Sequence, residues 1–238
     1  MTETPYIYQT LHVEGRKVRF LDRHIEMLKE GARRYFALDE EIDFEGIERR
    51  VAAHLDSLYY PKDRSSYLRL MVGADAVLTL EAEPSSLYRG YVLRAIRPEA
   101  EIVSFNTPFE DIPNSASRQA WHIAGAMCRG SVVVRRGVDS EILDADGGAQ
   151  LFALYGRAIF TSMEPRGVEA ELAAEAISRS GLKLSIEPVT EEHIQILDEL
   201  FYVDYRGVTS INSCSGRRFM SGCALKVATS MEQIVSKM

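Results

Sequence analysis

The chain has 238 residues, and its 28 lysines and arginines against 35 aspartates and glutamates give a formal net charge of −7. Hydrophobic residues make up 46% and charged residues 26%, a globular composition that excludes disordered, collagen-like and coiled-coil chains. The acidic balance argues against nucleic acid or an anionic membrane as the main partner, and the chain lacks an apolar run of about 18 residues that would span a membrane.

The chain opens with elements typical of a mixed α and β protein. Alternating residues over 6–13 predict a strand, which turns at Gly15 and returns through the sequence VRFL. Apolar residues recur at helical spacing over 22–36, so we predict a helix there, with Asp22 as its N-cap. The same spacing predicts a second helix over 44–58.

Further strands complete the first part of the chain. They are expected at 65–73, 76–84 and 88–96, each bounded by turn-forming residues. The segment Arg97–Pro98–Glu99 then predicts a boundary between two domains. We therefore predict an N-terminal α+β lobe over 1–97 and a C-terminal α+β lobe over 98–238.

The second lobe is predicted to begin with an irregular stretch over 102–119 and then to alternate between helices and strands. Gly181 ends one helix, and Thr190 caps the next. The predicted helices cover 117–128, 167–180, 190–200 and 223–238, and the predicted strands cover 131–137, 150–156, 157–162, 182–189 and 201–212. The fold class is therefore α+β, with mixed sheets in two lobes.

The cysteines and the N-terminus bear on the cellular environment. Cys128, Cys214 and Cys223 show no metal-ligand spacing, so we expect free thiols in a reducing cytoplasm and no metal site. The N-terminal residues lack the charged and then apolar layout of a secretion signal. We predict a cytoplasmic protein.

Several segments occur in the order known from one family of enzymes. They are YIYQTLHVEGRKV, FLDRHIEMLKEGARRYF, SSYLRLMV, DADGGAQLFALYGRAIFTS and the long stretch from PRGVEAEL to RGVTSI. In this order they resemble the class IV fold of pyridoxal-phosphate enzymes, which includes branched-chain aminotransferases, D-amino-acid transaminases and aminodeoxychorismate lyases. The resemblance covers nearly the whole chain. It implies a two-lobed class IV aminotransferase-like fold and a homodimer.

The family holds its cofactor as a Schiff base on one lysine, which lies four residues before the Asn or Arg that opens a helix. Arg118 resembles that helix-opening residue, so the lysine position falls at about Asn114. The chain has no lysine between Lys62 and Lys183, and a shift of a few residues in the alignment does not restore one. The catalytic residues are therefore left unassigned.

The other cofactor contacts that the resemblance implies are changed as well. The phosphate-binding arginine falls at Met27, and the glutamate that holds the pyridine nitrogen protonated falls at Ala145, where Asp144 or Asp146 would substitute if the loop shifted by one residue. The phosphate-binding turn becomes Gly167–Val168–Glu169, and a second phosphate-side contact falls near Asp204. Carboxylates at these positions repel a phosphate, by about 4 kcal/mol for a charge pair at about 4 Å and an effective dielectric of about 20. Their joint change indicates a lost cofactor site.

The resemblance also indicates which residues form a ligand site in the cleft between the lobes. Tyr8 and Tyr67 are expected to shape it, and Arg69 and Arg118 are expected to bind the ligand. The planar fork of arginine suits a carboxylate or phosphate, so the predicted partner is a small anionic metabolite.

Simpler structural roles explain most of the remaining candidates. We expect His24 in the core or at a helix cap, Asp144 and Asp146 in a glycine-flanked turn, and SCSGRRF in a hairpin rather than an anion-binding loop. His122 is kept as a candidate general base. Residues expected at the surface are His12, His54, His193, Lys226, Arg135 and Arg136.

Three hypotheses remain open at this point. In the first, the chain keeps the class IV fold without pyridoxal phosphate, is not a transaminase, and binds a small anionic metabolite or a partner in the former cofactor cleft. In the second, it is an active pyridoxal-phosphate-dependent aminotransferase or lyase acting on amino acids or aminodeoxychorismate. In the third, the resemblance is false and the chain is another two-lobed α+β protein. The first implies no cofactor, and whether the chain is an enzyme is left open.

Overall fold

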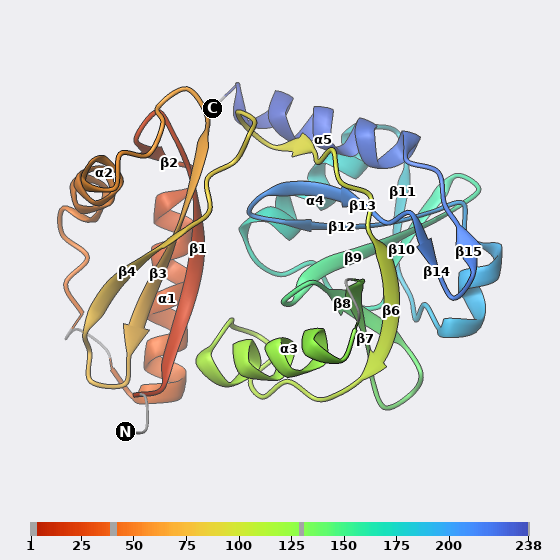
Figure 1. Cartoon of the computed structure of the whole chain (residues 1–238), viewed down its shortest axis with the longest axis horizontal. Helices are drawn as coiled ribbons and strands as arrows, with labels where there is room; N and C mark the ends of the chain where they lie inside the picture. The colour runs from red at the N-terminus through yellow and green to blue at the C-terminus, as the bar shows by residue number, and fades with distance from the viewer. Residues whose placement is uncertain (1–3, 39–41, 129–130, 238) are drawn as a thin grey trace. The chain divides into compact units, whose positions relative to one another are not determined.

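The computed structural model describes residues 4–38, 42–128 and 131–237. The chain forms two compact units (Figure 1). Unit 1 comprises Met1–Gly90 and Pro108–Arg118, and unit 2 comprises Tyr91–Thr107 and Gln119–Met238. The segment Pro108–Arg118 thus rejoins unit 1 after the chain has entered unit 2.

Unit 1 is an antiparallel sheet with the strand order β2-β1-β3-β4, covered by two helices on one face. The elements are β1 (Tyr6–Glu14), β2 (Lys17–Val18), α1 (Leu21–Phe36), α2 (Ile47–Ser57), β3 (Ser65–Gly73) and β4 (Leu78–Glu83). Alternate strand residues such as Leu11, Leu68 and Leu70 face the helices and pack against Leu28 and Val51. The strand periodicity therefore divides the sheet into an apolar face and a polar face.

Unit 2 is a mixed sheet with the strand order β15-β14-β6-β7-β8-β9-β12-β13-β5, and β10 and β11 extend it from β9. Its core is formed by residues such as Val134, Leu151, Leu200 and Tyr202. The strands are β5 (Val92–Leu93), β6 (Glu99–Ser104), β7 (Val132–Arg136), β8 (Ile142–Ala145), β9 (Ala149–Tyr155), β10 (Ala158–Thr161), β11 (Lys183–Ile186), β12 (Glu199–Asp204), β13 (Gly207–Ser210), β14 (Ser213–Cys214) and β15 (Arg217–Arg218).

The helices of the second half of the chain are α3 (Ser115–Met127), α4 (Val168–Arg179), the 3-10 helix η1 (Glu191–Ile196) and α5 (Gly222–Val235). The first turn of α3 belongs to unit 1, and α4 and α5 pack against each other in unit 2. Glu199 caps α5, because its carboxylate accepts hydrogen bonds from Cys223 N at 2.8 Å and Ala224 N at 3.0 Å. Among the described residues, no helix is long and apolar enough to cross a bilayer.

Several element predictions were wrong. Of the strand predicted over 88–96, only Val92–Leu93 forms a strand. The stretch predicted to be irregular over 102–119 begins inside a strand, because β6 runs from Glu99 to Ser104. The helix predicted over 190–200 is a short 3-10 helix, because β12 takes the chain from Glu199 onward. Thr190 does cap it, together with His193.

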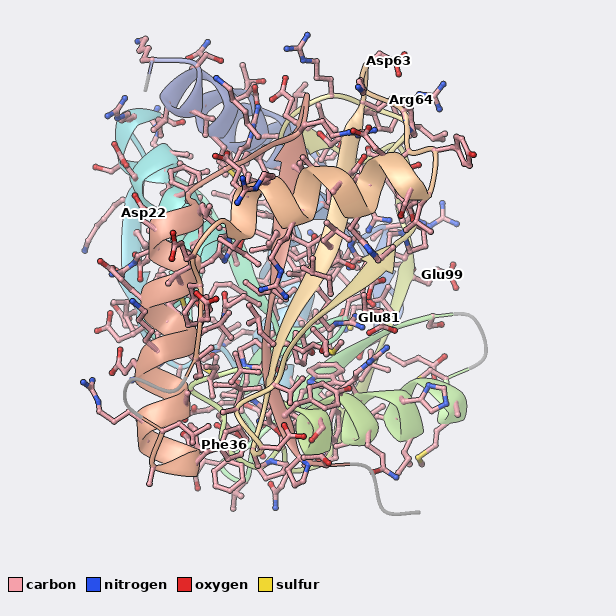
Figure 2. The ribbon with its side chains drawn as sticks, turned by 90° about the vertical axis from the view of Figure 1, so that its left-hand side faces the viewer. Asp22, Phe36, Asp63, Arg64, Glu81 and Glu99 are labelled. Carbon is pink, nitrogen blue, oxygen red and sulfur yellow. The ribbon has the colours of Figure 1, made fainter. Side chains whose placement is uncertain are left out.

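Local end signals were also partly wrong. The helix α1 begins at Leu21, with Phe20 rather than Asp22 at the N-cap position, and Asp22 lies in its first turn (Figure 2). Phe20 has a positive φ of 53°, a conformation in which the following helix starts without a side-chain cap. Asp22 is therefore a first-turn acid, which the helix dipole stabilises, and not the N-cap.

Two basic residues expected at the surface are buried. His12 has no exposed surface, and its Nε2 lies 2.7 Å from Ser65 Oγ. Arg135 is 1% exposed and donates from Nε and Nη2 to the two oxygens of Asp144, at 2.7 and 2.8 Å. A buried arginine needs such a bidentate partner, which only the pairing of β7 with β8 supplies.

Candidate functional site

The polar face of the unit 1 sheet carries a cluster of charged residues from three elements. Arg69 lies on β3 opposite Glu81 on β4, and Glu83 follows two residues later on the same face. Arg118 approaches from the first turn of α3. We call Arg69, Arg118, Glu81 and Glu83 the arginine–glutamate cluster.

Glu81 lies between the two arginines of this cluster. Its Oε2 accepts hydrogen bonds from Arg69 Nη1 at 2.5 Å and from Arg118 Nη1 at 3.2 Å, and its Oε1 lies 3.4 Å from Arg118 Nη2. Glu83 forms an ion pair with Nη2 of Arg69. The two positive charges are thus matched by two negative charges.

Tyrosines flank the cluster. The Arg69 guanidinium lies over the Tyr8 ring, 5.0 Å from its centroid, and Tyr6 OH accepts a hydrogen bond from Arg118 Nη1 at 2.9 Å. Burial raises the pKa of Tyr8, although Arg69 and Arg118 act in the opposite direction. Tyr8 is therefore held as a neutral phenol beside the arginine.

Burial and hydrogen bonding together set the charge state of the cluster. Burial raises the pKa of Glu81, but hydrogen bonds from Arg69 and Arg118 outweigh it and hold the pKa below its ordinary value. Arg69 is 8% exposed, and its Nε has no hydrogen-bond partner among the described residues. The two glutamates therefore leave one buried donor of Arg69 without a partner.

The residues predicted from sequence are only partly brought together. Tyr8, Arg69 and Arg118 meet in one cluster. Tyr67 lies on the same strand as Arg69 but packs edge-on against His12, with ring centroids 5.4 Å apart. His24 lies in the core beside Gln9, as expected, and burial lowers its pKa to about 4. His122 is exposed on α3.

Asn114 is the N-cap of α3. Its Oδ1 accepts a hydrogen bond from Ser117 N at 2.8 Å, while Ser117 Oγ accepts one from Asn114 N at 3.1 Å. Its Nδ2 donates to the carbonyls of Pro108, Phe109 and Ile112, at 2.9, 3.2 and 3.0 Å. The amide is therefore fully engaged in holding the segment before the helix.

The lysines of the chain are far from buried. The sequence has six, and all of them lie in the part of the chain that the structure describes: Lys17, Lys29, Lys62, Lys183, Lys226 and Lys237. Every one is exposed. Lys226, on α5, is exposed as its helical position predicts.

Unit 2 contains a second charged group, built on the start of α4, the turn between β8 and β9, the end of β12 and the turn between β12 and β13. We call Glu169, Asp204, Asp146 and Arg206 the acidic cluster. Arg206 donates from Nη2 to Asp146 at 2.5 Å and from Nε to Asp204 at 2.8 Å. Tyr202 OH donates to Asp146 at 3.1 Å.

Glu169 is the member of the acidic cluster with the most unusual titration. Tyr91 OH donates to its Oε1 at 3.2 Å. Burial, the larger cause, and the neighbouring Asp204 together raise the pKa of Glu169 to about 7, against that hydrogen bond. Asp146 and Asp204 pair with Arg206, and Asp204 also acts on Glu169, so the carboxyl groups of this cluster outnumber its arginine, an environment that disfavours a phosphate.

The partners of the arginines were missed from sequence. The alternation in LTLEAE does place Glu81 and Glu83 on one face, but their position opposite Arg69 needs the register of β3 against β4. Arg206 gave no local signal, because a turn arginine is usually solvated. Of the predicted turn, Asp146 belongs to the acidic cluster, whereas Asp144 pairs with Arg135.

These two units together have the fold of the class IV aminotransferases, with mixed sheets in an α+β arrangement. A branched-chain aminotransferase from Thermoproteus uzoniensis matches 97% of this chain and 85% of its own, with a TM-score of 0.76 and 17% identity. A putative branched-chain amino acid aminotransferase from Thermotoga maritima matches 98% and 87%, with a TM-score of 0.79 and 14% identity. A putative 4-amino-4-deoxychorismate lyase from Legionella pneumophila matches 98% and 90%, with a TM-score of 0.73 and 13% identity.

The likeness is one of fold. No family model matches the sequence, and no curated protein matches it either. The predicted fold class is confirmed, and the hypothesis of a false resemblance is wrong.

Proposed function

We propose that this protein uses the class IV fold without pyridoxal phosphate and binds a small anionic metabolite through Arg69 and Arg118. It is then a ligand-binding relative of the aminotransferases rather than a transaminase. The exposure of all six lysines carries the proposal. A Schiff-base lysine has to reach a protected site where its amine loses its proton and its carbon–nitrogen bond is shielded from water.

We infer that the residues present do not fit the cofactor at two further places. Asn114, at the implied lysine position, is occupied as a helix cap. Glu169 and Asp204, at the implied phosphate positions, are carboxyl groups near each other. A bound phosphate would add about two negative charges to this acidic cluster, where Arg206 is already paired.

The arginine–glutamate cluster supports the choice of an anionic ligand. The Arg118 side chain is 41% exposed, so it is within reach of solvent, and its fork already holds a carboxylate, that of Glu81. Arg69 is fixed by the sheet and keeps a buried donor without a partner. A carboxylate or phosphate is the group that two adjacent guanidinium forks bind best.

The cofactor part of the proposal is tested by a visible spectrum. The protein is purified with excess pyridoxal phosphate and desalted, and its spectrum is recorded before and after borohydride. We expect no retained chromophore beyond the trace that exposed lysines trap. A stoichiometric band that borohydride fixes would overturn the proposal in favour of an active aminotransferase or lyase, and peptide mapping would then name the lysine.

The ligand part is tested by calorimetric titration with inorganic phosphate and with succinate. We expect binding that Arg118→Ala abolishes. Arg136→Ala is the matched control, because Arg136 is 38% exposed and pairs with a 42% exposed Glu191, much as Arg118 pairs with Glu81. An equal loss of affinity in Arg118→Ala and Arg136→Ala would mean that the anion is attracted to exposed arginines in general rather than to a specific site.

A further inference from the structure

The position of Glu81 in the arginine–glutamate cluster resembles that of a bound carboxylate ligand. One oxygen is shared between Arg69 and Arg118, and the other faces the second nitrogen of the Arg118 fork. This is the fork-to-carboxylate arrangement with which arginine recognises free carboxylates. Glu81 lies on the unit 1 strand β4, and its side chain is labelled in Figure 2.

Glu81 is also the member of the cluster that is free to leave. Its side chain is 42% exposed, whereas those of Glu83 and Arg69 are 18% and 10% exposed. It lies on β4, the last strand in the order β2-β1-β3-β4, so no strand of this sheet flanks it on its outer side. Rotation of Glu81 into solvent would leave Arg69 paired with Glu83 and would free the Arg118 fork.

A second observation indicates that the glutamates do not fully satisfy the arginines. Nε of Arg69 is buried and without a hydrogen-bond partner among the described residues, although the side chain carries two ion pairs. An unsatisfied buried donor costs free energy, which a ligand with more acceptor oxygens can recover.

We propose that Glu81 is an intramolecular occupant of the anion site, which a carboxylate or phosphate ligand has to displace in order to bind between Arg69 and Arg118. This inference rests on the proposed function and adds the residue that regulates it. Glu81 competes at the high effective concentration of a tethered group, so weakly binding monoanions are excluded. The apparent affinity of any ligand is reduced by the fraction of molecules in which Glu81 is displaced.

The test is the affinity for inorganic phosphate and succinate in Glu81→Ala and Glu81→Gln, measured by calorimetric titration. If Glu81 is displaced in about a tenth of the molecules, removal of its carboxylate raises both affinities by about tenfold. Glu191→Ala is the matched control, since Glu191 is equally exposed and pairs with Arg136 at 2.6 Å. It should leave the affinities unchanged.

The double variant Glu81→Ala/Arg118→Ala separates the two proposals. Loss of the gained affinity in this variant supports displacement at the arginine pair. If ligand binding depends on Arg118 in the wild type but the affinity is unchanged in Glu81→Ala and Glu81→Gln, the role of Glu81 is overturned. The proposed anion site is then retained. The absence of Arg118-dependent binding in all variants overturns the proposed anion site itself.

Discussion

At the scale of single residues, the carboxyl group of Glu169 ties the acidic cluster to folding stability. Burial raises its pKa to about 7 in the folded protein, against an ordinary value of 4.5. The folded state therefore favours the protonated acid. Its contribution is fully present below pH 4.5 and is lost as the pH rises through 7.

Glu169→Gln should remove this pH-dependent loss of stability, because its amide stays neutral and keeps an oxygen that accepts a hydrogen bond from Tyr91. We expect the variant and the wild type to be equally stable near pH 4.5 and the variant to be more stable by about 2–3 kcal/mol at about pH 8. Urea unfolding across this range measures the difference. Glu171→Gln, an exposed glutamate on the same helix, should not reproduce it. A difference in the free energy of unfolding between Glu169→Gln and the wild type that does not change with pH would contradict the raised pKa of Glu169.

At the scale of elements, the start of α3 depends on Asn114. The side chain supplies the cap for Ser117 N and three donor contacts to the preceding segment, so one residue fixes both a helix and the chain that leads into it. The residue at which the resemblance to the class IV family places the lysine thus has a structural role of its own in this chain.

Asn114→Ala should lower the free energy of unfolding by about 2 kcal/mol or more, because it removes the cap and leaves carbonyls without donors. Asn114→Asp keeps the acceptor for Ser117 and loses only the donors, so an intermediate loss is expected. Denaturant midpoints measure both. An alanine variant within about 0.5 kcal/mol of the wild type would show that the cap is dispensable.

At the scale of the whole molecule, the resemblance to class IV enzymes leads us to predict a homodimer. Sedimentation velocity at micromolar concentration should give a species of twice the chain mass of 26.8 kDa. Each chain carries a net charge of −7, so two copies repel and added salt should strengthen the association. A species of the chain mass at every salt concentration would contradict the prediction.

The fold and the site differed in how far the sequence predicted them. The strands of unit 1 were found from alternation, and β3 falls on the predicted 65–73. The stretch 190–200 was misassigned because its apolar spacing fits an α-helix, whereas Glu191–Ile196 form a short 3-10 helix and Glu199 already pairs with β9 as the start of β12. Arg69 and Arg118 were found as charged residues, but their neutralisation by Glu81 and Glu83 was not.

By itself, the sequence determined the fold class, the position of most helices and strands, and the absence of a lysine at 63–182, because periodicity and composition are local properties of the chain. Only the tertiary structure decided which charges meet. Glu81 and Arg118 are 37 residues apart, and strand register together with the return of the chain at Pro108–Arg118 brings them into contact. Such contacts depend on how separate elements pack, which no local pattern encodes.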